Sequence, residues 1–139
     1  MDYSRPQNCI TFNLQKAART MARRMEAALA PFDLTAQQFS AMVILRNGGA
    51  LATTRLAEMT GTERTTITRN LKLLRKRGLV EAAYETDRRI NAIQLTDAGR
   101  AILSDAFPAW HKVQSAAIAQ IGKKKASDPA SLLSILSRI

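Results

Sequence analysis

The sequence predicts a mainly α-helical fold with a small β-hairpin, in which a winged helix-turn-helix is flanked by helices at both ends of the chain. Apolar residues recur at steps of three and four over most of the chain, as they do in amphipathic helices. Between residues 79 and 95 the pattern changes to short strands, and Ile93, Gln94 and Leu95 alternate as in a half-buried hairpin strand. The tip of this hairpin is the wing.

The composition indicates one folded domain with a basic surface. The chain has 139 residues, of which 46% are hydrophobic, enough for a core and against disorder. Lys and Arg number 21 against 11 acidic residues, a net charge of +10 that favours a polyanionic partner; simple solubility is the alternative. One cysteine, an N-terminus without an apolar run and the lack of any membrane-spanning stretch predict a cytoplasmic protein with no membrane association.

Three regions make up the predicted domain. Residues 1–34 form an N-terminal arm and a dimerisation helix, residues 35–96 form the winged helix-turn-helix, and residues 97–139 form C-terminal dimerisation helices. Pro31 ends the first helix, and Thr35 with Gln38 forms a capping box for the next. The terminal helices carry apolar faces that a small monomer would struggle to cover, so we expect a homodimer.

The central region contains two helices separated by a turn at Thr60-Gly61. We expect Thr53 or Thr54 to cap the first helix, and the residues around Leu51 to add a short strand beside the wing. The second helix runs from about residue 63 to residue 77 and buries a stripe of Ile67, Leu71 and Leu74.

The opposite side of this second helix is polar and basic. Six basic residues and no acidic residue lie between Arg64 and Gly78. A DNA major groove admits one α-helix, whose N-terminal half approaches the base edges. We therefore predict base contacts from Thr65, Thr66, Thr68 and Arg69, and contacts to the DNA backbone from Arg64, Lys72, Arg75 and Lys76. A surface helix with a solvated basic face is the alternative.

The hairpin tip offers a second contact with DNA. Arg88 and Arg89 can enter a minor groove, and Asp87 can hold the guanidinium of Arg89 by a charge-assisted hydrogen bond. An ordinary polar hairpin tip is the alternative.

These motifs resemble those of the MarR family of bacterial winged-helix regulators. The similarity rests on TTITRNLKLLRKRGLV, the DRR that follows it, LTDAG and the earlier LTAQQFSAM, and it runs over nearly the whole chain. The resemblance implies an obligate homodimer whose first and last helices interlock and whose two heads bind an inverted repeat. It also implies a cleft between the dimer helices and the head, where a ligand or an oxidised cysteine changes the head spacing. It identifies Arg89 as the wing arginine and Asp87 as its partner.

Cys9 leaves two interpretations open. Its place at the start of the first helix resembles that of the reactive cysteine in the peroxide-sensing branch of this family, and a helix N-terminus favours the thiolate. That branch holds the thiolate with partner tyrosines, and neither Tyr3 nor Tyr84 is well matched to them. The alternative is a buried cysteine that acts as a small hydrophobe.

The predicted function is that of a homodimeric, sequence-specific DNA-binding transcriptional regulator, a repressor of an inverted-repeat operator that a small-molecule ligand or an oxidant releases. An architectural DNA-binding protein with little sequence preference and no effector is the alternative, and a protein-binding winged helix is a third hypothesis. We find no nucleophile–base set, phosphate loop or paired acids, so no enzyme is expected. A lone His111 and Cys9 do not make a metal set, and no cofactor is expected. Phe107 and Trp110 suit a core, a dimer contact or a ligand cleft.

Overall fold

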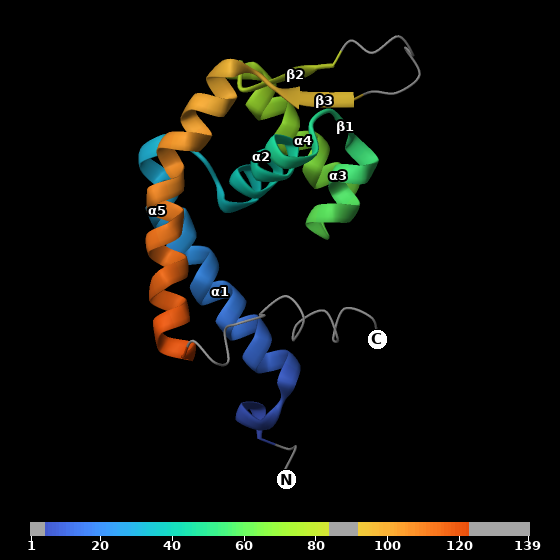
Figure 1. Ribbon diagram of the computed structural model, residues 1–139. Helices are drawn as coiled ribbons and strands as arrows, with labels where there is room; N and C mark the ends of the chain where they lie inside the picture. The colour runs from blue at the N-terminus through green and yellow to red at the C-terminus, as the bar shows by residue number, and fades with distance from the viewer. Residues whose placement is uncertain (1–4, 84–91, 123–139) are drawn as a thin grey trace.

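The computed structural model describes residues 5–83 and 92–122, in which a small head is carried on two long helices (Figure 1). The two helices are α1 (Ile10–Leu29) and α5 (Asp97–Ile121); they pack against each other, and we call them the stalk. The remaining elements form what we call the head: α2 (Ala36–Gly48), β1 (Leu51–Ala52), α3 (Thr53–Thr60), α4 (Arg64–Lys76), β2 (Val80–Ala82) and β3 (Ala92–Leu95). Short 3-10 turns, η1 (Pro6–Asn8) and η2 (Ala30–Phe32), precede and follow α1.

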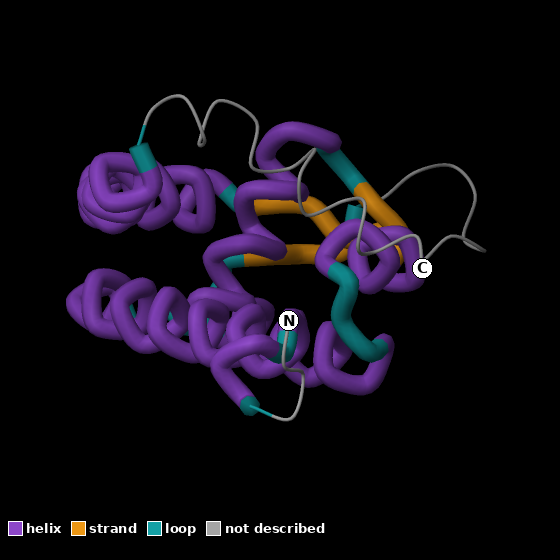
Figure 2. The backbone as a smooth tube through the Cα atoms, turned by 90° about the horizontal axis from the view of Figure 1, so that it is seen from below, coloured by secondary structure: helices purple, strands orange, loops and turns teal. Residues whose placement is uncertain are grey.

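The strands form an antiparallel sheet with the order β1-β3-β2. Figure 2 shows them grouped within the head with helices around them. Leu51 pairs with Ile93, and Val80 pairs with Leu95, so the short strand expected near Leu51 is confirmed as a partner of the hairpin. Ile93 and Leu95 are buried while Gln94 is only half-buried, as the alternation predicted. The predicted fold class is therefore confirmed.

The core lies where α2 meets the other elements of the head and the upper part of the stalk. Its largest fully buried side chains come from α1, α2, α3, α4, β2 and α5: Leu29, Phe39, Met42, Leu45, Leu56, Ile67, Leu74, Val80 and Leu103. Burial of such side chains away from water contributes about 1.5–3 kcal/mol each. The head and the near end of the stalk therefore share one core.

One predicted helix cap is present and one is wrong. The Thr35 hydroxyl accepts from the backbone N–H of Gln38 at 3.1 Å while the Gln38 side chain accepts from the N–H of Thr35, which confirms the capping box. By contrast, neither Thr53 nor Thr54 caps α3. The N-cap position is Ala52, which is extended and paired with Ala92, so the strand passes directly into the helix at Thr53.

The far end of the stalk exposes apolar side chains. They belong to both stalk helices: Ile10, Phe12, Leu14, Ile118 and Ile121. The C-terminal helix predicted beyond Gly122 lies outside the described residues. No helix in the described ranges is both long enough and apolar enough to cross a membrane.

Candidate nucleic-acid interface

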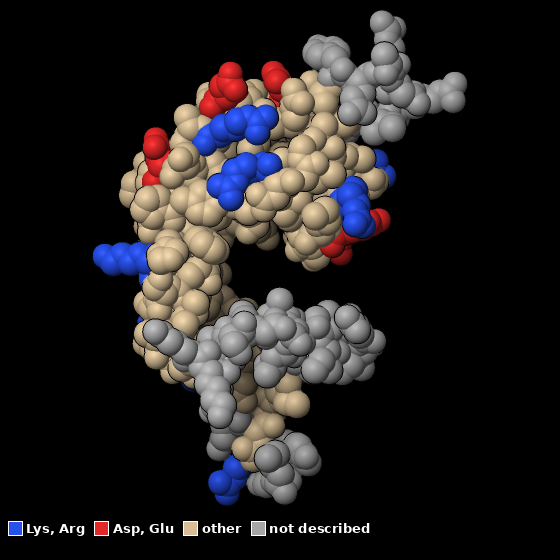
Figure 3. All heavy atoms as spheres, viewed as in Figure 1, with Lys and Arg blue, Asp and Glu red and all other residues tan. Residues whose placement is uncertain are grey.

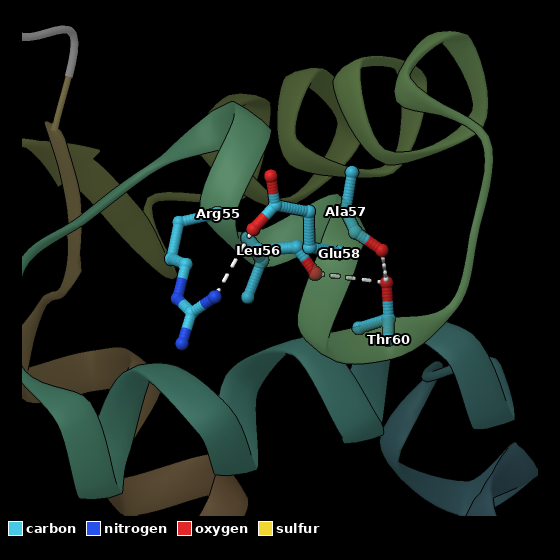
Figure 4. A network of polar contacts seen from close by, with 5 residues as sticks. All are labelled: Arg55, Leu56, Ala57, Glu58 and Thr60. Carbon is cyan, nitrogen blue, oxygen red and sulfur yellow. Dashed lines mark hydrogen bonds and ion pairs between the residues drawn. The ribbon is translucent and has the colours of Figure 1, made fainter. Parts of the chain in front are cut away.

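The turn between α3 and α4 is fixed mainly by backbone hydrogen bonds. Gly61 has φ +62°, a left-handed conformation that suits glycine, and the N–H of Thr62 donates to the carbonyl of Ala57 at 3.1 Å. The hydroxyl of Thr60 donates to the carbonyls of Leu56 at 2.9 Å and Ala57 at 3.1 Å (Figure 4). These bonds fix the C-terminal end of α3 and the first residues of the turn that leads to α4.

An exposed ion pair adds little to this turn. Arg55 and Glu58 approach to 3.0 Å on the outer side of α3 (Figure 4). Both side chains are more than half exposed, and such surface pairs contribute about 0–1 kcal/mol.

The inner face of α4 holds the helix against the head. Ile67, Leu71 and Leu74 are buried, as the spacing predicted. Asn70 is buried beside them, and its Nδ2 donates to Oε1 of Gln37 on α2 at 3.2 Å. Asn70 was not predicted from the sequence to be buried, although a polar residue three positions after Ile67 in a buried stripe signals a specific partner. The bond limits rotation of α4 about its own axis.

The outer face of α4 presents most of the predicted base-reading residues. Thr65, Thr68 and Arg69 are exposed, while Thr66 is half-buried and so offers less surface. The hydroxyl of Thr68 donates to the carbonyl of Arg64 at 2.8 Å, which occupies its proton within the helix. Thr68 therefore keeps its oxygen lone pairs and its methyl group for a base edge, whereas Arg69 keeps all its donors, since within the described residues it forms no ion pair.

Three of the four predicted backbone-contacting residues, Lys72, Arg75 and Lys76, border two hollows on α4. One, of about 310 Å³, lies between α4 and the hairpin and includes Lys72 and Arg75 together with Thr68, Ala82 and Ile93. The other, of about 560 Å³, is lined by residues of α4 alone: Arg69, Lys72, Leu73, Arg75 and Lys76. Lys72 and Arg75 thus stand between α4 and the hairpin strands β2 and β3, where they can meet the phosphates at the edge of a groove that α4 enters.

Arg77 departs from this face, although the sequence analysis counted it among the six basic residues. Its guanidinium turns away from the hollows of α4 and donates to two carbonyls of the linker between α1 and α2. The wing residues Asp87, Arg88 and Arg89 lie outside the described residues, so their roles stay predictions.

The positive charge is not confined to α4. On the face drawn in Figure 3, Lys and Arg side chains appear both on the head and along the stalk, whereas Asp and Glu side chains appear only in the upper part of the view, over the head and the adjoining end of the stalk. A broad positive field of this kind attracts a polyanion before specific contacts form.

Two other residues from the sequence analysis occupy distinct places. Cys9 is the N-cap residue of α1, and it is exposed. In a single copy of this chain Cys9 is therefore not a buried small hydrophobe, which was the alternative interpretation. His111 is exposed and its Nδ1 lies 3.3 Å from the hydroxyl of Ser115. No cluster of three potential metal ligands occurs in residues 5–83 and 92–122.

The aromatic residues of α5 are half-buried and pack against the core. Phe107 and Trp110 pack on Phe39 of α2, with ring centroids 5.5 Å and 6.2 Å from that of Phe39. Arg46 stands over the Phe107 ring at 4.2 Å, a cation–π contact between the end of α2 and the stalk. These contacts with α2 support the first of the three roles that the sequence suggested for Phe107 and Trp110, packing against the core.

Comparisons with known proteins agree with this geometry. A family model described as "MarR family" matches residues 32–90. The HTH-type transcriptional regulator YwaE of Bacillus subtilis is 30% identical over 116 residues, which cover 82% of this chain and 68% of YwaE. The crystal structure of the M. tuberculosis transcriptional regulator MosR in complex with DNA is 35% identical, with a TM-score of 0.77, and the match covers 94% of this chain and 97% of MosR. The repressor CouR bound to p-coumaroyl-CoA has a TM-score of 0.86 over 99% of this chain and 98% of its own; at 22% identity it shows the fold alone.

Proposed function

Because this chain belongs to the MarR family of DNA-binding transcriptional regulators, we propose that it is a homodimer that represses transcription from an inverted-repeat operator. One observation carries the proposal. The outer face of α4 carries threonines and Arg69 at its N-terminal half and lysines and arginines at its C-terminal half, with no acidic residue between, and Arg69 forms no ion pair within the described residues. That order matches a helix whose first turns read bases and whose last turns meet phosphates.

The dimer is proposed from the stalk. Residues 1–34 and 97–139 supply the dimerisation region, and the apolar side chains exposed on α1 and α5 are the surface that a second copy would cover. In a two-fold dimer each α4 meets one half-site, and half-sites are about 34–36 Å apart from centre to centre. Every base contact then counts twice.

The residue roles follow the geometry of α4. Base contacts are assigned to Thr65, Thr66, Thr68 and Arg69, with Thr66 the most restricted by burial. Backbone contacts are assigned to Arg64, Lys72, Arg75 and Lys76, and minor-groove contacts to the wing residues Asp87, Arg88 and Arg89.

The effector is also a proposal. A small-molecule ligand or an oxidant that alters the stalk would alter the distance between the two heads and so release the operator. Support for an oxidant comes from Cys9, an exposed thiol at the N-cap of a stalk helix. Support for a ligand comes from the fold that this chain shares with CouR, which was solved with p-coumaroyl-CoA.

Selection of binding sites from a random pool of duplex DNA, with purified protein at moderate salt, tests the proposed function. The expected result is an enriched inverted repeat whose half-sites lie about one helical turn apart. Strong binding without any enriched motif would instead support the architectural alternative. An enriched single half-site, with no repeat, would contradict the dimer.

A further inference from the structure

One arginine at the end of α4 bonds to the stalk side of the molecule. Arg77 is the C-cap residue of α4, and its side chain is only 30% exposed. Its Nη2 donates to the carbonyl of Phe32 at 3.1 Å, and its Nη1 donates to the carbonyl of Asp33. The bonds join residues 44 and 45 positions apart in the sequence. Arg77 therefore cannot meet a phosphate without releasing the linker between α1 and α2.

The linker presents two consecutive carbonyls to this guanidinium. It includes η2 and Asp33, which has φ +51° and is the one non-glycine residue with a positive φ among those the structure describes. A planar guanidinium binds two acceptors at once, which the single ammonium of lysine does not reproduce. The carboxylate of Asp33 contributes less, because it is 92% exposed and its Oδ2 lies 3.8 Å from Nε of Arg77.

The residues directly after Arg77 are bonded to the other stalk helix. The hydroxyl of Thr96, the N-cap residue of α5, donates to the carbonyl of Gly78 at 2.6 Å. The N–H of Thr96 donates to the carbonyl of Leu79 at 3.2 Å. The end of α4 is thus connected to α1 through the linker and to α5 through Thr96.

We propose that Arg77 is a positioning residue: it fixes the orientation of α4 relative to the stalk and so sets the half-site spacing that the dimer accepts. The proposal rests on the proposed function, because spacing has a meaning only for a dimer on an inverted repeat. Its physical basis is that the shared core joins the head to the stalk mainly through α2, whereas the end of α4 is held to the stalk by the Thr96 contacts and by the Arg77 bonds. The Arg77 bonds tie the end of α4 to the linker that follows α1, and the Thr96 contacts tie the residues after α4 to the start of α5, so loss of the Arg77 bonds loosens one of these two attachments.

The test measures affinity as a function of operator spacing. The selected operator is prepared with its spacer unchanged and with one base pair added or removed, which moves a half-site by about 3.4 Å and rotates it by about 35°. Dissociation constants are measured by fluorescence anisotropy for wild type, Arg77→Lys and Arg77→Gln. Arg75→Gln is the matched control, since it removes the same charge from the same helix end without touching the linker. Asp33→Asn is the second control, since it keeps both carbonyls.

The proposal predicts that the penalty for a wrong spacer becomes about tenfold smaller in both Arg77 variants, equivalent to ~1.4 kcal/mol. Arg75→Gln should weaken binding to all three duplexes by a similar factor, and Asp33→Asn should keep the wild-type profile. If both Arg77 variants keep the wild-type loss of affinity for the wrong spacers, the proposal is overturned. It is also overturned if Arg75→Gln reduces that loss as much as the Arg77 variants do. If wild type itself binds all spacers equally, the proposed function fails and this proposal fails with it.

A measurement without DNA guards against variants that fold poorly. Spin labels at Thr54→Cys, an exposed position on α3, in a Cys9→Ser background report the distance between the two heads. Arg77→Lys should broaden that distance distribution while the melting temperature of the folded dimer is checked separately. A distribution as narrow as that of wild type would overturn the proposal.

Discussion

Replacing Gly99 by alanine should destabilise the protein, because α5 approaches the end of α4 too closely for a side chain there. A Cβ atom at Gly99 would lie 2.0 Å from the carbonyl oxygen of Leu79 and 3.3 Å from Cδ2 of Leu95. Cβ contacts under 3.0 Å essentially do not occur, so the first turn of α5 must move away from Leu79 by about 1 Å.

The expected loss of stability follows from the contacts that this movement disturbs. The two bonds from Thr96 to Gly78 and Leu79 lie at this contact, and each contributes about 0.5–1.5 kcal/mol. Overpacking adds about 1–3 kcal/mol, and the higher helix propensity of alanine returns about 1 kcal/mol. The free energy of unfolding should fall by roughly 1–5 kcal/mol, which at about 3 °C per kcal/mol lowers the melting temperature by about 3–15 °C.

The assay is thermal unfolding followed by far-UV circular dichroism at one fixed protein concentration, since the stability of a dimer depends on concentration. Gly48→Ala is the matched control, because its Cβ would meet only the flexible side chain of Leu51, at 3.1 Å. That control should stay within about 1 kcal/mol of wild type. The reasoning would be refuted if Gly99→Ala had the melting temperature of wild type, or if Gly48→Ala lowered the melting temperature as much as Gly99→Ala does.

Four further substitutions separate the proposed contacts. Arg69→Ala should lose about 1–3 kcal/mol per half-site on the selected operator and little on random duplex, as measured by competition binding. Lys76→Ala should weaken both duplexes alike and reduce the slope of log affinity against log salt by about 2 per dimer; identical profiles for these two variants would contradict our sorting of contacts. Arg89→Ala should weaken DNA binding while sedimentation still shows a dimer; unchanged affinity would remove the wing contact. Cys9→Ser should bind DNA normally and abolish release by peroxide; a response that persists would exclude Cys9.

The features of the fold that local patterns encode could be predicted from the sequence. The buried stripe of α4 follows from spacing alone, and the Thr35 capping box needs only residues three positions apart. The LTDAG motif was recognised, but the reason for its glycine was not, because the close approach of Gly99 to Leu79 exists only after α5 packs on the end of α4.

Features that depend on distant partners could not be predicted. The cap expected at Thr53 or Thr54 is missing because Ala52 pairs with Ala92, 40 positions away. The orientation of Arg77 depends on carbonyls that the fold brings close to it, and the burial of Asn70 depends on Gln37. A basic residue at a helix end has the same sequence signal whether it meets a phosphate or a carbonyl.

The central claim is that the outer face of α4 reads base sequence in a dimer, and the ratio of two affinities tests it most directly. Dissociation constants are measured for the selected operator and for a scrambled duplex of equal length, at several salt concentrations. We expect the operator to bind at least about 10³-fold more tightly at physiological salt, with two protomers per duplex. A ratio near one, with the same steep salt dependence for both duplexes, would contradict sequence reading and favour a protein that binds DNA through its phosphates alone.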